Sequence, residues 1–164
     1  MSAKPSKRVL GGREKVKVAI VQKSPVFMNR EASVARACDA IEEAGRNGAH
    51  LVVFPEAWLA GYPYWTEGWD SPLPQWAGGR VFFRDNVLVV PSEDSERIAH
   101  AVQRAGVYVT LGCNEIDPRP EVHTIYNSLI FFRPDGTVLG RHRKLMPTFT
   151  DRMYWGQGDA PDLA

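Results

Sequence analysis

A strand, an amphipathic helix and a second strand follow one another between residues 15 and 54, and this order constrains the fold most strongly. Lys15–Gln22 is a β-branched run, which is typical of a strand. From Asn29 onward, apolar residues recur at helical spacing: Val34, Cys38 and Ile41. His50–Phe54 is nearly all apolar, which suits a strand buried on both faces. Strand, helix and strand make a crossover unit, so we predict an α/β fold.

The remainder of the chain extends this unit into a mixed sheet. Residues 57–80 are too irregular for a strand, and we read them as a loop that leads into a short helix near 75–86. A second helix opens at Ser92 with acidic residues in its first turn and stops at Gly106. Three further runs predict strands, the last two joined as a hairpin: 107–112, 126–132 and 137–142. After Leu145 we expect irregular structure.

Composition and charge narrow the classes of partner. The chain has 164 residues with 44% apolar and 24% charged side chains, an ordinary globular composition. A net charge of +1 gives no large basic field, so we predict no nucleic-acid partner. The basic run 141–144 is short, and a nucleic-acid patch there is a minor alternative. No run of 18 apolar residues exists, so we predict no membrane partner.

The first fifteen residues are polar and rich in lysine and arginine, without the apolar core of a secretory signal. We interpret residues 1–15 as a flexible lead-in and the protein as cytoplasmic. The four histidines are scattered, without metal-ligand spacing, so we predict no metal site.

The two cysteines make neither a disulfide framework nor a metal motif. Cys38 lies on the apolar stripe of the first helix, where a packing role is expected. Cys113 ends the third strand, two residues before a glutamate, which invites interpretation as a nucleophile. No histidine or other base adjoins it in sequence, so a small buried hydrophobe is the favoured reading, with a spatial neighbour left open.

Two charged residues stand at strand ends, where open α/β sheets place their ligands. Glu56 follows the second strand and precedes an aromatic-rich turn; partial desolvation there makes a carboxylate a better base near neutral pH. Lys144 follows the hairpin and precedes Leu-Met-Pro; an ammonium there can stabilise an anionic intermediate. The alternatives are that Glu56 is a surface-loop residue or a cap for the next turn, and that Lys144 is a solvated cation.

An aromatic set follows Glu56 closely: Trp58, Tyr62, Tyr64, Trp65 and Trp69. It suits a pocket for an apolar substrate, of which Trp58, Tyr62 and Tyr64 are our candidates. Equally, it suits the core or a surface that packs against another subunit. From the residues alone these readings stay open.

Two segments resemble the nitrilase superfamily of carbon–nitrogen hydrolases. Gly48–Pro63 reads Gly-Ala-His-Leu-Val-Val-Phe-Pro-Glu-Ala-Trp-Leu-Ala-Gly-Tyr-Pro and is similar to the signature around the family's glutamate. Gly140–Thr148 is similar to the segment around the family's lysine, and Tyr126-Asn127-Ser128 also fits. The resemblance runs from about Val16 to the last residue. Two sequence segments resemble nitrilases more than the amidase branches: Gly-Tyr-Pro-Tyr-Trp and Lys-Leu-Met-Pro-Thr.

The resemblance implies a fold, a four-layer α-β-β-α sandwich of which this chain is the amino-terminal half. Residues 16–164 would then form an incomplete carbon–nitrogen hydrolase domain that lacks its carboxyl-terminal half. A half-domain leaves a sheet edge and apolar surface uncovered. We therefore expect marginal stability, aggregation or pairing with another chain. The family resemblance also implies a homo-oligomer for the full-length form.

The resemblance implies a mechanism as well. Glu56 would be the general base, Lys144 would support the intermediate, and a cysteine thiolate would attack a nitrile carbon to give a thioimidate. None of the twenty residues after Lys144 is a cysteine, so the nucleophile is absent. Asp151 stands where the family usually has a glutamate, and its shorter side chain would support Lys144 less well. No metal or organic cofactor is implied.

The expected activity is conversion of a small-molecule nitrile to a carboxylic acid and ammonia by the full-length form, with this chain itself inactive. Two alternatives remain from the sequence. One is an amidase of the same superfamily, and the other is a non-catalytic binding or assembly module.

Overall fold

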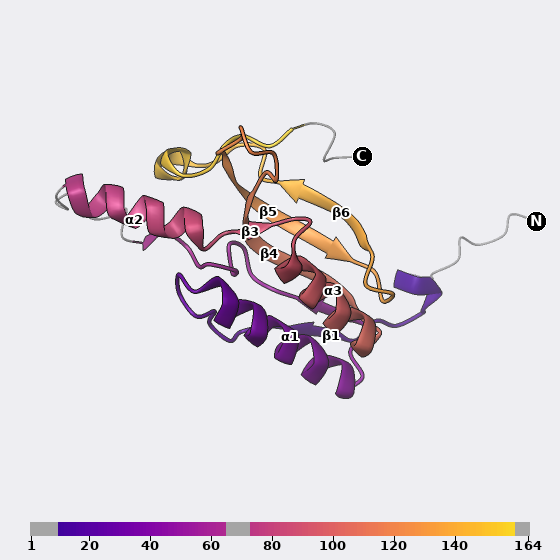
Figure 1. Ribbon diagram of the computed structural model, residues 1–164. Helices are drawn as coiled ribbons and strands as arrows, with labels where there is room; N and C mark the ends of the chain where they lie inside the picture. Colours follow the sequence, from indigo (N-terminus) through magenta and orange to yellow (C-terminus); the bar gives the residue numbers. More distant parts are fainter. Residues whose placement is uncertain (1–9, 65–72, 160–164) are drawn as a thin grey trace, which may run out of the picture.

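The computed structural model describes residues 10–64 and 73–159, which form one six-stranded mixed sheet with helices (Figure 1). The strands are β1 Val18–Ile20, β2 Leu51–Val53, β3 Leu88–Val89, β4 Tyr108–Ile116, β5 Ile125–Phe132 and β6 Val138–Arg143. The helices are α1 Arg30–Arg46, α2 Leu73–Asp85 and α3 Glu93–Ala105, with 3-10 turns η1 Leu10–Gly12 and η3 Phe149–Met153.

The sheet has the order β1-β2-β4-β5-β6, with β3 also paired to β4. The pairs β1–β2, β2–β4 and β3–β4 are parallel, whereas β4–β5 and β5–β6 are antiparallel. The predicted α/β class, the crossover unit and the carboxyl-terminal hairpin are therefore confirmed. The carboxyl ends of β2 and β6 point to the same edge of the sheet, because β2 and β4 are parallel and the chain reverses twice between β4 and β6.

Local capping signals fix the two helices that cover the sheet. The Asn29 side chain accepts a hydrogen bond from the backbone N–H of Ala32 at the start of α1. Ser92 and Ser95 form a reciprocal capping box at the start of α3, and Gly106 ends that helix with a left-handed φ of 64°. These ends agree with the sequence predictions to within a few residues.

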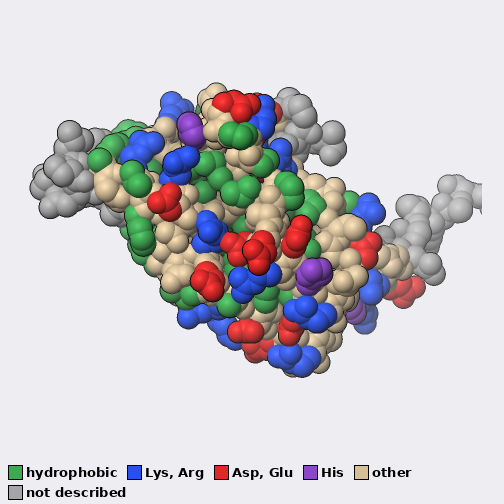
Figure 2. All heavy atoms as spheres, in the orientation of Figure 1, with side chains coloured by type: hydrophobic (Ala, Val, Ile, Leu, Met, Phe, Trp, Pro, Cys, Tyr) green, Lys and Arg blue, Asp and Glu red, His purple; other side chains and the backbone are tan. Residues whose placement is uncertain are grey.

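The core lies between one face of the sheet and the helices α1 and α3, which run side by side in Figure 1. Its side chains come from alternate positions of the strands and from the inner helix faces. Fully buried examples are Val34, Ile41, Val52, Ile98, Leu111 and Ile130. On the face of the molecule that Figure 2 shows, acidic and basic side chains are interspersed, without a patch of one sign.

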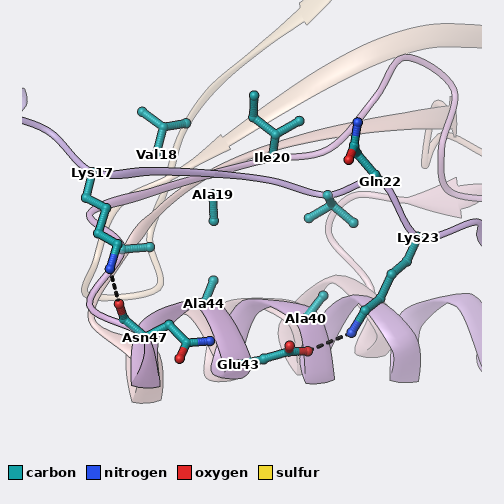
Figure 3. Close-up of a pocket in the computed structure, with 12 residues that line it drawn as sticks. Lys17, Val18, Ala19, Ile20, Gln22, Lys23, Ala40, Glu43, Ala44 and Asn47 are labelled. Carbon is teal, nitrogen blue, oxygen red and sulfur yellow. Dashed lines mark hydrogen bonds and ion pairs between the residues drawn. The ribbon is translucent and has the colours of Figure 1, made fainter.

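The opposite face of the sheet, here called the open face, carries the alternate strand residues, among them the apolar residues Val18, Ile20, Leu51, Val53, Leu129 and Phe131. Figure 3 shows Ala19 pointing toward Ala40 and Ala44 of α1, whereas Val18 and Ile20 point away from the helix. The exposed fractions of Val18 and Ile20 are 46% and 72%. The uncovered apolar surface expected of this sheet is thus present.

Burial of β2 on both faces was a wrong prediction. Val52 is fully buried against the helices, but Leu51 and Val53 on the open face are only half-buried. The reason is that no helix or second sheet among residues 10–64 and 73–159 covers the open face. The apolar character of β2 is therefore only partly used within the described chain.

Short elements also departed from the predictions. Strand β3 has only two residues, too few for a pattern, and β4 extends four residues beyond the predicted end at Gly112. The segment after Leu145 was expected to be irregular, yet it contains η3. The proposed lead-in 1–15 falls largely outside the described residues, although Leu10–Gly12 forms the turn η1.

The open face predicts self-association of the isolated chain. Ile20→Lys places a charge on exposed surface, so it should reduce association while changing the free energy of unfolding by about 0.5 kcal/mol or less. Ala19→Lys, its neighbour on the helix side, should instead lower that free energy by roughly 1–3 kcal/mol through overpacking. Sedimentation velocity over a concentration series, with chemical denaturation, measures both effects. A wild-type chain that stays monomeric and melts sharply and reversibly would contradict this expectation.

Candidate active site

Glu56 and Lys144 form an ion pair at the edge of the sheet. The distance between Glu56 Oε1 and Lys144 Nζ is 3.0 Å, although the two residues are 88 positions apart in sequence. Glu56 follows β2 and Lys144 directly follows β6. The structure therefore brings together the two charged residues that the sequence placed at strand ends.

Glu56 reaches Lys144 because the segment after β2 bulges over the open face of β4 at Gly112. Two strands, β4 and β5, separate β2 from β6 in the sheet. Beyond Glu56 the chain returns to the edge of β4, where the Leu59 backbone N–H donates to the Gly112 carbonyl at 3.1 Å and the Asn114 backbone N–H donates to the Leu59 carbonyl at 3.2 Å. A Cβ atom added at Gly112 would lie 1.9 Å from the Pro55 carbonyl oxygen. Only a glycine leaves room for this bulge.

Strand alternation separates the site from the core. Asn114 faces Asn127 in the β4–β5 register, and the next residues in line, Glu115 and Ser128, point to the opposite face. The Asn127 side-chain amide donates to Glu56 Oε1 at 2.6 Å, and the Asn127 backbone carbonyl accepts from the Lys144 backbone N–H at 2.8 Å. These polar groups border a cavity of about 430 Å³ lined by Glu56, Asn127, Leu129, His142, Lys144 and Leu145.

Asp151 is the second carboxylate on Lys144. Its Oδ2 lies 3.2 Å from Lys144 Nζ and accepts from the Thr148 backbone N–H, while its Oδ1 accepts from the Tyr62 hydroxyl at 2.8 Å. Asp151 lies in η3, and this turn brings the carboxylate to the ammonium. The shorter aspartate side chain therefore still makes the contact.

The environment of Lys144 favours its charged form. Partial burial acts to lower the pKa of Lys144, but the hydrogen bonds to Glu56 and Asp151 outweigh it and raise the pKa above its ordinary value. The side chain of Lys144 is 32% exposed. The ammonium thus remains protonated throughout the neutral range, held between two carboxylates.

The expected desolvation of Glu56 is not found in the described residues. Its side chain is 61% exposed. The position lies on the open face, where nothing in the described chain covers it. Its surroundings are therefore those of a hydrogen-bonded surface carboxylate.

The candidate pocket aromatics have three different environments. Trp58 is buried against Phe54 and donates its indole N–H to the Lys23 carbonyl at 2.7 Å, so it belongs to the core. Tyr62 is half-buried and bonds Asp151, and Tyr64 is exposed. All three line a cavity of about 370 Å³ that Glu56 also borders. Trp65 and Trp69 lie outside the described residues.

Three polar residues of this region were not singled out from the sequence. Asn114 is fully buried. Its side-chain amide group donates to the Leu59 and Gly61 carbonyls at 2.9 and 3.0 Å, and its side-chain oxygen accepts from the Trp155 indole N–H at 2.8 Å. Asn127 bonds Glu56 as described above. The family match at Tyr126-Asn127-Ser128 and the place of Glu115 two residues after Cys113 give no sign of these cross-strand partners.

Glu115 is the third, and it explains the basic run. It is fully buried on the helix side of β4, where its carboxylate bonds Arg141 at 2.7 Å, Arg143 at 2.9 Å and Ser128 at 2.7 Å. Arg143 also lies 3.8 Å from the centroid of the Tyr126 ring. Because β6 alternates, its arginines bind the buried glutamate while Lys144 turns to the open face. The three cations of the run, Arg141, Arg143 and Lys144, are thus engaged in ion pairs within the chain.

Neither cysteine reaches the ion pair. Cys113 is fully buried on the helix side of β4, and desolvation, with the nearby Glu115 charge, raises its pKa well above the ordinary value. Cys38 lies on α1 beside the core, and burial raises its pKa too. The predicted packing role of Cys38 agrees with this position. Both thiols are therefore poorly disposed to form a thiolate at neutral pH.

Within residues 10–64 and 73–159, no group of three or more histidine, cysteine or carboxylate side chains is arranged to hold a metal ion. In the same part of the chain, no helix has both the length and the apolarity needed to cross a bilayer.

We expect Cys113 to resist alkylation in the folded chain. In a Cys38→Ser variant, the remaining thiol should react with iodoacetamide at neutral pH only when the chain unfolds, because burial suppresses both access and thiolate formation. Mass spectrometry over a denaturant series measures the modified fraction. The wild type, in which Cys38 is only partly buried, is the comparison. Rapid modification of Cys113 in the native variant would contradict its assigned burial.

We expect Gly112→Ala to displace the turn that carries Glu56. The new methyl group would meet backbone atoms of Pro55, so the free energy of unfolding should fall by roughly 1–3 kcal/mol. Gly140→Ala is the matched control on β6, where an added Cβ meets no atom within 4 Å. Thermal melting and a crystal structure of each variant measure the effects. An unchanged melting temperature and Glu56–Lys144 distance in Gly112→Ala would refute this prediction.

The chain matches known proteins over nearly its whole length. The carbon–nitrogen hydrolase family model matches residues 17–164. An aliphatic nitrilase from Sinorhizobium fredii is 38% identical over 91% of this chain and 48% of its own length. A cyanide hydratase from Stereum hirsutum is 37% identical over 87% of this chain and 37% of its own length.

Solved structures show the same fold. Nit3 from Saccharomyces cerevisiae, a member of branch 10 of the nitrilase superfamily, aligns with a TM-score of 0.63 and 26% identity over 88% of this chain and 49% of its own. The chain spans about half the length, or less, of the curated relatives it matches. With the family model covering residues 17–164, the chain belongs to the carbon–nitrogen hydrolase family, within the nitrilase superfamily.

Proposed function

We propose that this chain is the part of a nitrile hydrolase that supplies the general base and the stabilising cation. The observation that supports this most is the 3.0 Å contact between Glu56 and Lys144 beside a cavity of about 430 Å³. A carboxylate and an ammonium held together at one edge of a sheet can move a proton and stabilise negative charge in the same place.

In the proposed reaction, a cysteine thiolate attacks the nitrile carbon, and the nitrogen gains a proton to give a thioimidate. Water then adds to the thioimidate carbon, and ammonia leaves, which gives a thioester. A second water releases the carboxylic acid and restores the thiol. Two waters are consumed for each acid and ammonia formed. Glu56 takes the thiol proton and activates each water, and Lys144 stabilises the charge that develops on the substrate.

Asp151 has a supporting role in this proposal. Its carboxylate is held by Tyr62 and by the start of η3, and it lies 3.2 Å from the ammonium. Two carboxylates on one lysine fix its position before substrate arrives, and such preorganisation is a main source of electrostatic catalysis. Tyr62, Trp58 and Tyr64 would border the substrate on the side of Glu56.

The nucleophile must come from outside the described chain. Cys113 lies on the helix side of β4, opposite the face that carries Asn114 and Asn127, and Cys38 lies on α1. We therefore propose that residues 16–164 are completed by further family sequence that covers the open face and brings the thiol. The chain alone would then release no ammonia.

We propose a small nitrile as substrate because relatives that are 37–38% identical are named as an aliphatic nitrilase and a cyanide hydratase. The completed enzyme would work without a metal or organic cofactor. We also propose a cytoplasmic homo-oligomer, without nucleic-acid or membrane partners. An amidase is the alternative, and hydrolysis of amides but not nitriles would establish it. If the completed protein hydrolyses neither nitriles nor amides, a binding or assembly module is favoured instead.

Activity assays on the completed protein test the proposal. Glu56→Gln should lower kcat by about 10²–10⁴-fold through loss of the base, and Lys144→Met by about 10²–10³-fold through loss of the cation. Glu42→Gln is a matched control, because Glu42 pairs with Arg104 in the helix layer away from the site. Ammonia release from aliphatic and aromatic nitriles, and from the corresponding amides, is the measurement. Full activity of Glu56→Gln would rule out Glu56 as the base.

A further inference from the structure

We propose that Asn127 is a positioning residue that holds Oε1 of Glu56 and so makes Oε2 the oxygen that exchanges the proton. The inference rests on the proposed function in that it takes Glu56 to be the base. It goes further by naming which carboxylate oxygen acts and which side chain decides this.

Both donors to Glu56 converge on one oxygen. Asn127 Nδ2 lies 2.6 Å from Oε1, and Lys144 Nζ lies 3.0 Å from the same atom. Within the described residues, Oε2 accepts no hydrogen bond. An oxygen that already accepts two hydrogen bonds, one of them from a cation, is the weaker proton acceptor of the two. The proton therefore goes to Oε2.

Asn127 is held more firmly than the carboxylate it binds. The residue is only 4% exposed and lies on β5, between β4 and β6. The Asn127 backbone carbonyl accepts a hydrogen bond from the Lys144 backbone N–H at 2.8 Å, so this one residue contacts both members of the ion pair. Glu56, by contrast, is 61% exposed and sits on a turn. Without the amide, its carboxylate could rotate about the Cγ–Cδ bond and exchange its two oxygens.

The opposite residue on β4 supports the same arrangement from the other side. Asn114 faces Asn127 across the strand pair and bonds the carbonyls of Leu59 and Gly61, in the segment that follows Glu56. It thus fixes the turn that carries Glu56, whereas Asn127 fixes the carboxylate itself. This division distinguishes a role in orientation from a role in packing.

The first arm of the test does not need activity. In the ¹⁵N-labelled 164-residue chain, the Asn127 side-chain amide signal is identified by its absence from Asn127→Asp. We expect one of its two protons to be shifted downfield by the bond to the carboxylate, and the shift to be lost in Glu56→Ala. Glu56 is exposed, so this variant keeps its packing. A signal that does not change in Glu56→Ala would overturn the proposal.

The second arm is a double-mutant cycle in the completed, active protein. Asn127→Ala should lower kcat by about 10²-fold, the order expected for a misplaced catalytic group, and leave KM within a few-fold. In a Glu56→Gln background it should cost no further activity, because Asn127 acts only through the carboxylate. Asn29→Asp is the control, since aspartate also caps α1. Additive losses, or an effect on KM alone, would overturn the proposal.

The two arms separate the failure of this inference from the failure of the proposed function. If the completed wild type hydrolyses no nitrile or amide, the proposed function fails, and the amide signal still decides whether Asn127 binds Glu56. If the wild type is active and the losses are additive, the proposed function stands and Asn127 has no positioning role.

Discussion

The strand β4 is the constraint on which the rest of the structure depends. It pairs in parallel with β2 and β3 and antiparallel with β5, so both the crossover unit and the hairpin are attached to it. Its two faces have opposite tasks. One face buries Leu111 and Cys113 against the helices, and the other bears Gly112 and Asn114 beneath the segment that carries Glu56. A change of register by one residue would exchange these faces.

The polar groups of the site follow from this two-sidedness. Residues on the helix side of the β4–β5–β6 sheet form a buried cluster around Glu115, whose charge is matched by Arg141 and Arg143. A buried carboxylate without partners would cost several kcal/mol, and the two arginines offset that cost. Residues that alternate with these along the strands, such as Asn114 and Asn127, point to the open face and belong to the candidate site. The charges of the buried cluster and those of the candidate site are thus adjacent in the chain but lie on opposite faces of the sheet.

Much of the fold was predictable because its signals are local. The β-branched runs, Asn29 before α1, the acidic first turn after Ser92 and the turn before Thr137 each depend on a few neighbouring residues. Glu56 and Lys144 could be proposed because both follow strands and lie in segments that resemble the family. β3 and η3 could not, since the first is too short for a period and the second depends on the capping contacts of one aspartate.

Side-chain contacts between residues on different strands could not be predicted from the sequence. The bonds from Asn127 to Glu56, from Trp155 to Asn114 and from Arg143 to Glu115 all join residues far apart in the chain. Which residues meet depends on the strand register, and the register is not written in the spacing of any one segment. The half-burial of Leu51 and Val53 was missed for a similar reason: an apolar run indicates what a strand can bury, and only the structure shows what lies over it.

Two separate requirements, one of the backbone and one of charge, act on the side chain of Asp151. Its carboxylate begins η3 by accepting the Thr148 backbone N–H, and the same group binds the ammonium of Lys144 and the hydroxyl of Tyr62. An asparagine could begin the turn but would not balance the charge, and a neutral hydroxyl side chain could not accept three donors in this arrangement. The local geometry of the backbone and the electrostatics of a distant strand end therefore select the same residue type at this position.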